Sequence, residues 1–172
     1  MLSSTSIESE IQELIDNDII LTIGSKECAD IVNKLSKKAD KKIRAHIKID
    51  TGFGRYGFIY SDIRTIVEAI NSLKSVSIEG MYSHFSLAYY KNNKWTIKQF
   101  NRFMEVVEAL KLNDINIQTL HICNSPAFLN YPNMHLNGAR IGSAFLGRVD
   151  ADINVGLKKI GKLKCSIEAV SY

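Results

Sequence analysis

The residue types best suited to chemistry gather in four short segments, and residues 46–58 form the first of them. This segment ends an otherwise apolar stretch with Lys48 and Asp50 and follows them with three glycines and Arg55. Glycines let a backbone turn sharply or approach a ligand closely, so the segment is suited to holding an anion. The simpler interpretation is an ordinary turn with an ion pair between Asp50 and either Lys48 or Arg55.

The second and third segments offer an imidazole and a hydroxyl at similar positions. Residues 80–86 contain His84, which in such a place is more often a packing residue than a ligand. Residues 121–126 contain Asn124 and Ser125 directly before Pro126, where a helix is expected to begin. Ser125 is there either a simple helix cap or, with the free N–H groups of a helix start, part of a phosphate site.

The fourth segment, residues 139–147, groups Arg140, Gly142 and Ser143. It again combines a cation, a flexible backbone position and a hydroxyl. Each of the four signals is weak by itself. Because all four follow an expected strand, we expect them to meet at one rim and to bind one anionic ligand.

Short apolar strands and amphipathic helices alternate along the chain and must position these segments. Strands are expected at residues 19–23, 43–49, 76–82 and 115–122, with a short fifth strand near 139–141. Helices are expected at residues 5–16, from Ser25 onward, at 62–73 and at 94–112, with Thr5 and Glu8 as a capping box for the first. Such parallel βα units build either an open doubly wound sheet or a closed (β/α)8 barrel.

The composition excludes several other classes of protein. A chain of 172 residues that is 45% hydrophobic is sized for one core. Its longest apolar runs are too short for a membrane-spanning helix, and its first ten residues lack a targeting pattern, so we expect a cytoplasmic protein with no membrane partner. Basic pairs such as Lys37 with Lys38 are not interleaved with aromatic residues, so no nucleic-acid partner is expected.

The cysteines fit neither a disulfide framework nor a metal site. Cys28, Cys123 and Cys165 are odd in number and far apart in the sequence. We therefore expect reduced, buried thiols and no bound metal.

Taken in order, the four segments resemble the alanine racemase family. The barrel domain of that family contains a K-x-D-T-G-M-x-R-x-G segment, a T-H-F segment, an N-S-A-A segment and an R-x-G segment that ends in L-Y-G. This chain has similar segments around Lys48, His84, Ser125 and Arg140, and the resemblance runs from Leu2 to the end. It implies a pyridoxal phosphate (PLP) dependent isomerase that interconverts L- and D-alanine, a small amino-acid substrate, for peptidoglycan biosynthesis.

The resemblance also implies a fold and a domain organisation. The expected fold is α/β, a partial TIM-type (β/α)8 barrel with parallel strands that lacks the first strands and the C-terminal β-domain of the family. Residues 1–156 are assigned to this partial barrel. Residues 157–172 are assigned to the start of a linker or strand that leads to the missing β-domain.

Three residues take catalytic roles by position in the resemblance. Lys48 matches a lysine that is carbamylated in many members, and Arg55 matches the arginine that contacts the phenolic oxygen of the cofactor. His84 matches the histidine that supports a second arginine beside the cofactor ring.

The cofactor-binding positions follow in the same way. Arg140 matches the arginine that faces the pyridine nitrogen, and a permanent cation there keeps that nitrogen unprotonated. Ser125, Gly142 and Ser143 match phosphate-binding positions, Ser143 through its backbone N–H, and Asn124 lies beside them.

Racemisation needs a base on each face of the substrate Cα, and neither base of the family has a match here. In the family these bases are a lysine of the first barrel strand, which also holds PLP covalently, and a tyrosine of the partner subunit. We therefore expect no covalent PLP and no racemase activity from this chain alone. Phe53, Ser83, Pro126 and Leu146 depart from the family pattern near the pocket, so these positions bear on which amino acid is the substrate.

Two other functions stay open. The chain is alternatively a non-catalytic PLP-binding barrel protein, or an inactive remnant that assembles with another chain. An incomplete barrel exposes sheet edges and apolar surface, so a homo-oligomer or a complementing chain is expected.

Overall fold

The computed structural model describes residues 4–39 and 41–147, and these form a parallel sheet covered by helices. The main strands lie side by side in the order β1 (Leu21–Ile23), β2 (Ile43–Asp50), β4 (Val76–Tyr82), β5 (Thr119–Cys123) and β6 (Gly138–Ala139). A short strand, β3 (Phe58–Ile59), pairs with the end of β2. The helices are α1 (Glu8–Asp16), α2 (Lys26–Ser36), α3 (Ile63–Ser72), α4 (Lys94–Lys111) and α5 (Ser125–Asn130), with a 3-10 turn η1 (Pro132–Met134).

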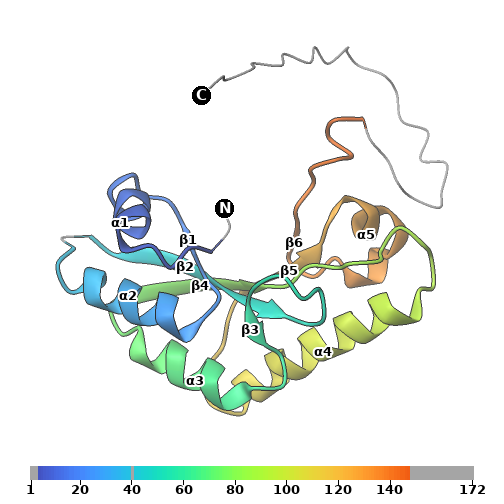
Figure 1. The fold of residues 1–172 in the computed structure, drawn as a ribbon. Helices are drawn as coiled ribbons and strands as arrows, with labels where there is room; N and C mark the ends of the chain where they lie inside the picture. Colours follow the sequence, from blue (N-terminus) through green and yellow to red (C-terminus); the bar gives the residue numbers. More distant parts are fainter. Residues whose placement is uncertain (1–3, 40, 148–172) are drawn as a thin grey trace.

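The order of the strands decides between the two architectures that the sequence pattern allowed. Successive main strands are parallel neighbours, and a helix connects each to the next. A doubly wound sheet reverses its strand order at a switch point and carries helices on both faces. Here the order never reverses, and α2, α3 and α4 follow one another along one face of a curved sheet (Figure 1). The fold is therefore an arc of a (β/α)8 barrel, as the resemblance implied.

The expected strands and helices are confirmed, with corrections at their ends. The capping box at Thr5 and Glu8 is wrong, because the first helix begins at Glu8 with Ile7 as its N-cap, and the hydroxyl of Thr5 instead accepts a bond from the Ile7 N–H at 3.2 Å. Ser25 caps α2 as predicted, since its hydroxyl accepts the Cys28 N–H at 3.2 Å. The strand expected at 115–122 begins only at Thr119.

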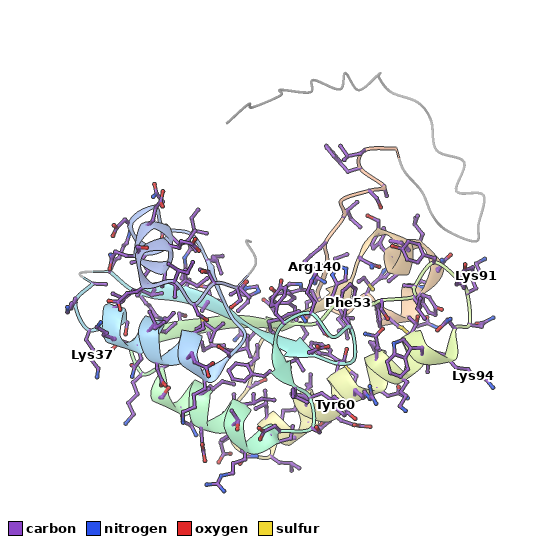
Figure 2. All side chains as sticks on the ribbon, in the orientation of Figure 1. Lys37, Phe53, Tyr60, Lys91, Lys94 and Arg140 are labelled. Carbon is purple, nitrogen blue, oxygen red and sulfur yellow. The ribbon has the colours of Figure 1, made fainter. Side chains whose placement is uncertain are left out.

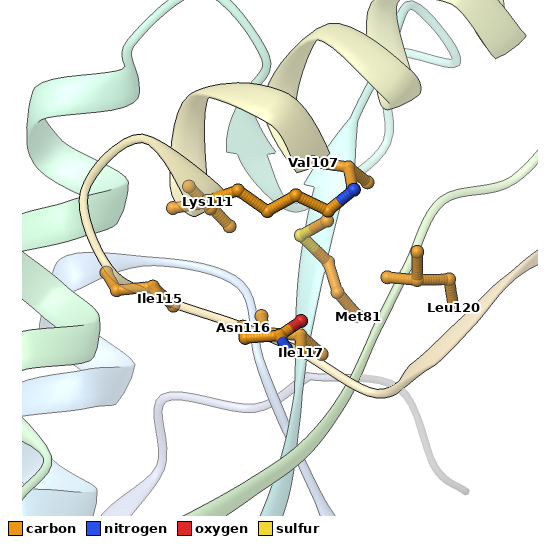
Figure 3. A pocket seen from close by; sticks show the side chains of 8 residues that line it. Met81, Val107, Lys111, Ile115, Asn116, Ile117 and Leu120 are labelled. Atoms are coloured by element: carbon orange, nitrogen blue, oxygen red, sulfur yellow. The ribbon is translucent and has the colours of Figure 1, made fainter.

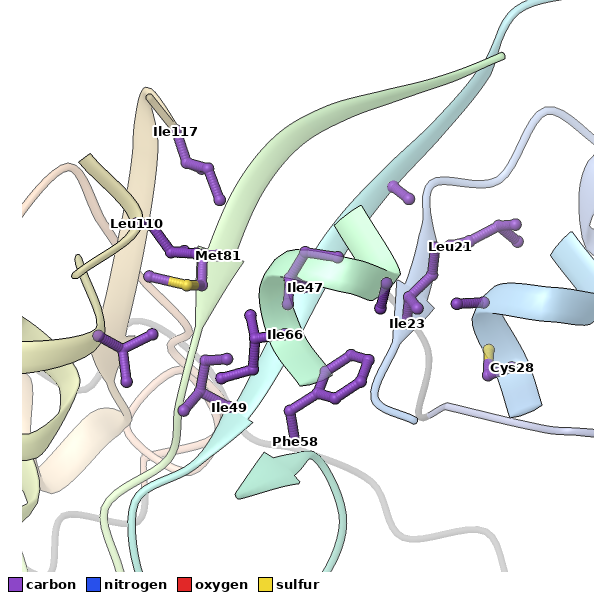
Figure 4. Packing of buried hydrophobic residues seen from close by; sticks show 14 of the residues in the cluster. Leu21, Ile23, Cys28, Ile47, Ile49, Phe58, Ile66, Met81, Leu110 and Ile117 are labelled. Carbon is purple, nitrogen blue, oxygen red and sulfur yellow. The ribbon is translucent and has the colours of Figure 1, made fainter. Parts of the chain in front are cut away.

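Strand β2 shows why this sheet has one apolar face and one polar face. Ala45, Ile47 and Ile49 are fully buried in the core between sheet and helices. Figure 4 shows this core, in which Ile47 and Ile49 lie close to residues of the neighbouring elements. Burial of each of these two isoleucine side chains contributes about 1.5–3 kcal/mol. Because strand side chains alternate, His46 and Lys48 point to the opposite face, the barrel interior.

Two crevices in the described part of the chain are too small for an organic ligand. One lies between α4 and strands β4 and β5 and is lined by Met81, Val107, Lys111 and their neighbours (Figure 3). Its volume of about 10 Å³ holds at most one water molecule.

Several expectations fall wholly or partly outside residues 4–39 and 41–147. Cys28 and Cys123 are buried free thiols, whereas Cys165 is not among the described residues. The assignment of 157–172 also lies outside them, and the boundary at residue 156 stays a prediction. Within the described part, no helix has the length and hydropathy to cross a bilayer, and no cluster of three His, Cys, Asp or Glu residues is arranged to hold a metal ion.

Candidate functional site

The loop after β2 is organised by the carboxylate of Asp50. This carboxylate accepts hydrogen bonds from the backbone N–H groups of Gly52 and Phe53 at 2.8 Å each, and of Gly54 at 2.9 Å. Four ion pairs occur in the described part of the chain, and none includes Asp50. The interpretation of this segment as a turn with an ion pair at Asp50 is therefore wrong. Asp50 shapes the loop that presents Arg55.

Lys48 is buried beside the carboxyl end of β2 with only 2% of its surface exposed. Its Nζ donates to the Ile49 carbonyl at 2.7 Å and lies over the rings of Tyr56 and Tyr82, 5.3 and 5.6 Å from their centroids. Burial, together with the charges of Arg140 and Arg55, lowers the pKa of Lys48 to about 8 against the opposing effect of Asp50. A fraction of this side chain is therefore an uncharged, nucleophilic amine near neutral pH.

Arg140 occupies the centre of the site. Its Nη2 donates to the Ser83 carbonyl at 2.6 Å and lies 3.1 Å from Nδ1 of His84, while its Nη1 lies 2.6 Å from Nδ1 of His121. The guanidinium also covers the ring of Tyr82, 4.9 Å from its centroid. The predicted neighbours Arg140 and His84 are thus in direct contact.

The two histidines that contact Arg140 must be uncharged. An arginine can only donate, so the Nδ1 atoms of His84 and His121 both accept and carry no proton. Burial first, and then the charge of Arg140, lowers the pKa of His84 to about 4 and that of His121 to about 3. These rings consequently add no positive charge beside the guanidinium.

Because these histidines are neutral in the folded chain, we expect the fold to lose stability in acid. Because their folded pKa values lie below the ordinary value of about 6.5, their stabilising effect is complete above that pH and is lost as the pH falls below it. We expect the free energy of unfolding in urea to fall between pH 7.5 and 5, by at most about 2 kcal/mol for His121.

A variant isolates this contribution. His121→Gln should show a smaller fall over the same pH range. The carboxylates with lowered pKa values, Asp62 and Glu68 among them, are the same in both proteins, so they contribute equally to the two falls. Equal falls in the original chain and the variant would contradict the assignment.

Arg55 lies at the rim of the site rather than within it. Its exposed guanidinium stacks over Phe53 at 4.7 Å and Tyr56 at 5.3 Å. Phe53 in turn meets the His84 ring edge-on at 5.4 Å. Figure 2 labels Phe53 and Arg140 at the same end of the sheet. The ring of Phe53 therefore lies between Arg55 and His84, and His84 in turn contacts Arg140.

Ser125 joins the start of α5 to the loop after Arg140. Its hydroxyl oxygen accepts the backbone N–H groups of Gly142 at 3.0 Å and Ala144 at 3.2 Å. The cap of α5 is Asn124, whose Oδ1 accepts the Ala127 N–H at 3.1 Å, so the interpretation of Ser125 as the helix cap is wrong. Ser143 lies in the same loop, where its carbonyl accepts the Leu146 N–H. The backbone of 142–144 thus already presents N–H groups to an oxygen atom.

Sequence reasoning missed four polar side chains of the site. Tyr82 stacks on His121 with ring centroids 5.1 Å apart, its hydroxyl lies 3.3 Å from that of Tyr56, and His121 in turn contacts His46. Burial raises the pKa of Tyr82, so it stays a neutral phenol. For His46 the available signal was the alternation of polar residues through residues 43–49, which is unusual in a strand buried on both faces.

A parallel barrel arc whose cations, neutral imidazoles and hydroxyl lie at the carboxyl ends of its strands belongs to the class of (β/α)8 barrels, in which ligand sites are built on that rim. The chain belongs to the family described as alanine racemase, N-terminal domain, whose model matches residues 1–149. The predicted family and fold are thereby confirmed.

Two alanine racemases show how much of the chain is similar to known members of the family. The alanine racemase of Methanococcus maripaludis is 36% identical over 148 residues, which are 85% of this chain and 39% of that protein. The structure of the Clostridium difficile 630 alanine racemase in complex with cycloserine matches with a TM-score of 0.81 at 31% identity, over 88% of this chain and 42% of that chain. This chain therefore spans less than half the length of these relatives.

A solved structure of lower sequence identity shares the fold. The alanine racemase of Bartonella henselae, with covalently bound pyridoxal phosphate, matches with a TM-score of 0.70 at 19% identity, over 80% of this chain and 38% of that chain.

Proposed function

We propose that this chain provides the ring-binding and phosphate-binding part of a PLP site in an enzyme that interconverts L- and D-alanine. The observation that supports this function best is the fixed guanidinium of Arg140, which contacts Ser83, His84 and His121 within 3.1 Å. Membership of the alanine racemase family supports the reaction class. In this proposal the substrate is a small amino acid.

The donor groups of the site fit the two ends of PLP. Arg140 is a permanent cation among neutral rings, and a cation beside a pyridine nitrogen disfavours its protonation. Ser125 and the backbone N–H groups of Gly142 and Ser143 would hold the phosphate, in a loop that already directs N–H groups at the Ser125 oxygen. Asn124 would support this end by capping α5 and by donating from Nδ2 to the Phe85 carbonyl at 3.2 Å.

When bound, PLP would supply an electron sink for the charge left on the substrate Cα after a proton leaves. The residues of this chain would orient that chemistry. Arg140 would keep the ring nitrogen unprotonated, and His84 would hold the Arg140 side chain. Arg55 would attract the substrate carboxylate from its position on the rim.

We propose that Lys48 is carbamylated. The ammonium would first lose a proton, and the resulting amine would attack CO₂. An N–C bond forms, one C=O π bond of CO₂ opens to give a carboxylate, and a second proton leaves the nitrogen, so that the side chain changes from a cation to an anion. The lowered pKa of Lys48 supports this reaction, since only the free amine is nucleophilic. The new carboxylate would attract Arg55. Carbon-13 NMR after exposure to labelled CO₂ should show one carbamate signal, which Lys48→Arg should remove.

The phosphate assignment is tested by Ser125→Ala. Removing the hydroxyl that organises the 142–144 backbone should weaken PLP binding about tenfold, the effect of roughly one charge-assisted hydrogen bond. Binding is measured from the absorbance of PLP titrated with the purified chain. Ser143→Ala is the matched control. Because Ser143 is proposed to act through its backbone N–H, this variant should bind PLP with the affinity of the original chain. Equal losses in the two variants would contradict the assignment.

We further propose that the 172-residue chain alone does not racemise alanine, because no residue in it matches either base of the family. Incubation of the purified chain with PLP and L-alanine should yield no D-alanine above a protein-free control. Measurable D-alanine would overturn this proposal.

Assembly and location are part of the same proposal. We propose that the chain acts in the cytoplasm, in the supply of D-alanine for the cell wall, as a homo-oligomer or with a complementing chain. In the described residues, β1 and β6 each pair along one edge only, and such edges favour pairing with another chain. Size-exclusion chromatography should show a species larger than a monomer. A monomer that binds no PLP would favour an inactive remnant.

A further inference from the structure

Arg140 is the end of a chain of hydrogen-bonding side chains that crosses the inner face of the sheet. Nη1 of Arg140 lies 2.6 Å from Nδ1 of His121, and Nε2 of His121 lies 3.0 Å from Nδ1 of His46. The two imidazole rings are tilted by 56° with centroids 5.2 Å apart. This row connects strand β2 with the residue that follows β6.

The arginine determines the direction of every hydrogen bond in this row. Because a guanidinium only donates, Nδ1 of His121 accepts and its single proton lies on Nε2. That proton is donated to His46, so Nδ1 of His46 is also an acceptor. If Nδ1 of His46 carried a proton, it would face the Nε2–H group of His121, and neither nitrogen could accept a hydrogen bond. The intact row therefore requires both rings to be neutral, with Nε2 protonated.

Gly80 provides the space in which the His46 ring lies. The two residues are partners in adjacent strands, and the strand register shifts between Ala45 and His46. A Cβ atom on Gly80 would lie 2.6 Å from Cε1 and 2.7 Å from Nδ1 of His46, closer than real contacts allow. Irregularities of this kind redirect side chains in sheets. Glycine at position 80 is thus a steric requirement of the row.

We propose that His46, held against Gly80, is a positioning residue for Arg140. Its Nδ1 accepts a hydrogen bond from the Nε2–H group of His121 and so keeps Nδ1 of His121 available as an acceptor for the guanidinium. Arg140 then has acceptors on His121, His84 and Ser83, which fix it in both position and rotation. Only the last step, that Arg140 faces a PLP ring, rests on the function proposed above.

Nitrogen-15 NMR of histidine tests the direction of these bonds without any ligand. In the purified chain at pH 7.5, His46 and His121 should each show an unprotonated Nδ1 and a protonated Nε2. The Nη signals of Arg140 should be separate, because a fixed guanidinium rotates slowly. A proton on Nδ1 of either histidine would overturn the proposal.

Two substitutions of His46 separate positioning from packing. His46→Asn keeps an acceptor oxygen near the place of Nδ1, so His121 should keep its tautomer and Arg140 its separate signals. His46→Leu fills a similar volume without an acceptor, so His121 should populate both tautomers and the Nη signals should merge. Unchanged spectra in His46→Leu would overturn the proposal. If that variant does not fold, the tautomers of the unsubstituted chain and of His46→Asn still test it.

Gly80→Ala provides an independent test because it leaves His46 in the sequence. Its methyl group should displace the His46 ring and give the spectra expected for His46→Leu, and spectra like those of the original chain would overturn the proposal. PLP affinity should fall roughly tenfold in His46→Leu and stay within twofold in His46→Asn. If the original chain does not bind PLP but its tautomers are as expected, the proposed function fails and the positioning of Arg140 stands.

Discussion

Replacing Arg140 by lysine should lower the free energy of unfolding by about 3 kcal/mol, because a lysine cannot satisfy the groups that the guanidinium joins. Arg140 contacts the Ser83 carbonyl and Nδ1 of both His84 and His121, and it also lies 3.4 Å from the carbonyls of His121 and Ile122. A single ammonium reaches only part of this set. The remaining acceptors would be buried without a donor.

Arg140→Met should lower the free energy of unfolding by more than Arg140→Lys does. It should also change the pKa values of the histidines that Arg140 contacts. Loss of the charge removes the second cause of the low pKa values of His84 and His121, so both values should rise toward the ordinary histidine range. Urea unfolding and histidine NMR titration measure the two effects. Arg44→Lys is the matched control, since Arg44 forms an exposed pair with Asp18 and should lose less than about 0.5 kcal/mol. Equal losses at positions 44 and 140 would contradict the central role of Arg140.

Gly57→Ala should lower the free energy of unfolding by about 2–4 kcal/mol and loosen the loop that presents Arg55. Gly57 has φ +123°, and a Cβ there would lie 2.9 Å from both the Asp50 nitrogen and Cγ of Lys48. The substitution therefore combines a strained backbone with a clash against the residues that form the site. We also expect the signals of Lys48 and Asp50 to shift in NMR spectra.

Gly54→Ala is the control in the same loop. Gly54 also has a positive φ, +76°, but a Cβ there would meet nothing within 4 Å. Both substitutions restrict the unfolded chain equally, so their difference reports on the folded state. The control should lose only about 1 kcal/mol. A loss at Gly54 as large as that at Gly57 would show that backbone strain, rather than contact with Lys48 and Asp50, controls this loop.

Much of the fold followed from local patterns. The strand at 76–82 was predicted at its observed bounds, and the helix expected at 94–112 differs from α4 by one residue. These elements have strong apolar periodicity and clear ends, which are local properties of the chain. The strand expected at 115–122 started four residues too early, because Ile115 and Ile117 pack against the core without entering the ladder.

The candidate site was predicted less completely, and the roles of its residues remain predictions. The order of the four motifs in the sequence indicated that Arg140 and His84 belong to one site, and the structure shows them in direct contact. It did not indicate His46, Tyr82 or His121. Their proximity depends on strand register, which pairs His46 with Gly80 and Tyr82 with His121.

The sequence by itself determined that parallel βα units carry their polar residues at the strand ends, because apolar periodicity and short motifs are encoded locally. Only the tertiary structure decided that Asp50 bonds to backbone N–H groups instead of a cation, and that His121 contacts both Arg140 and His46. The physical reason is that a hydrogen bond depends on distances of a few tenths of an ångström between residues that the chain separates widely. Packing and strand register set those distances.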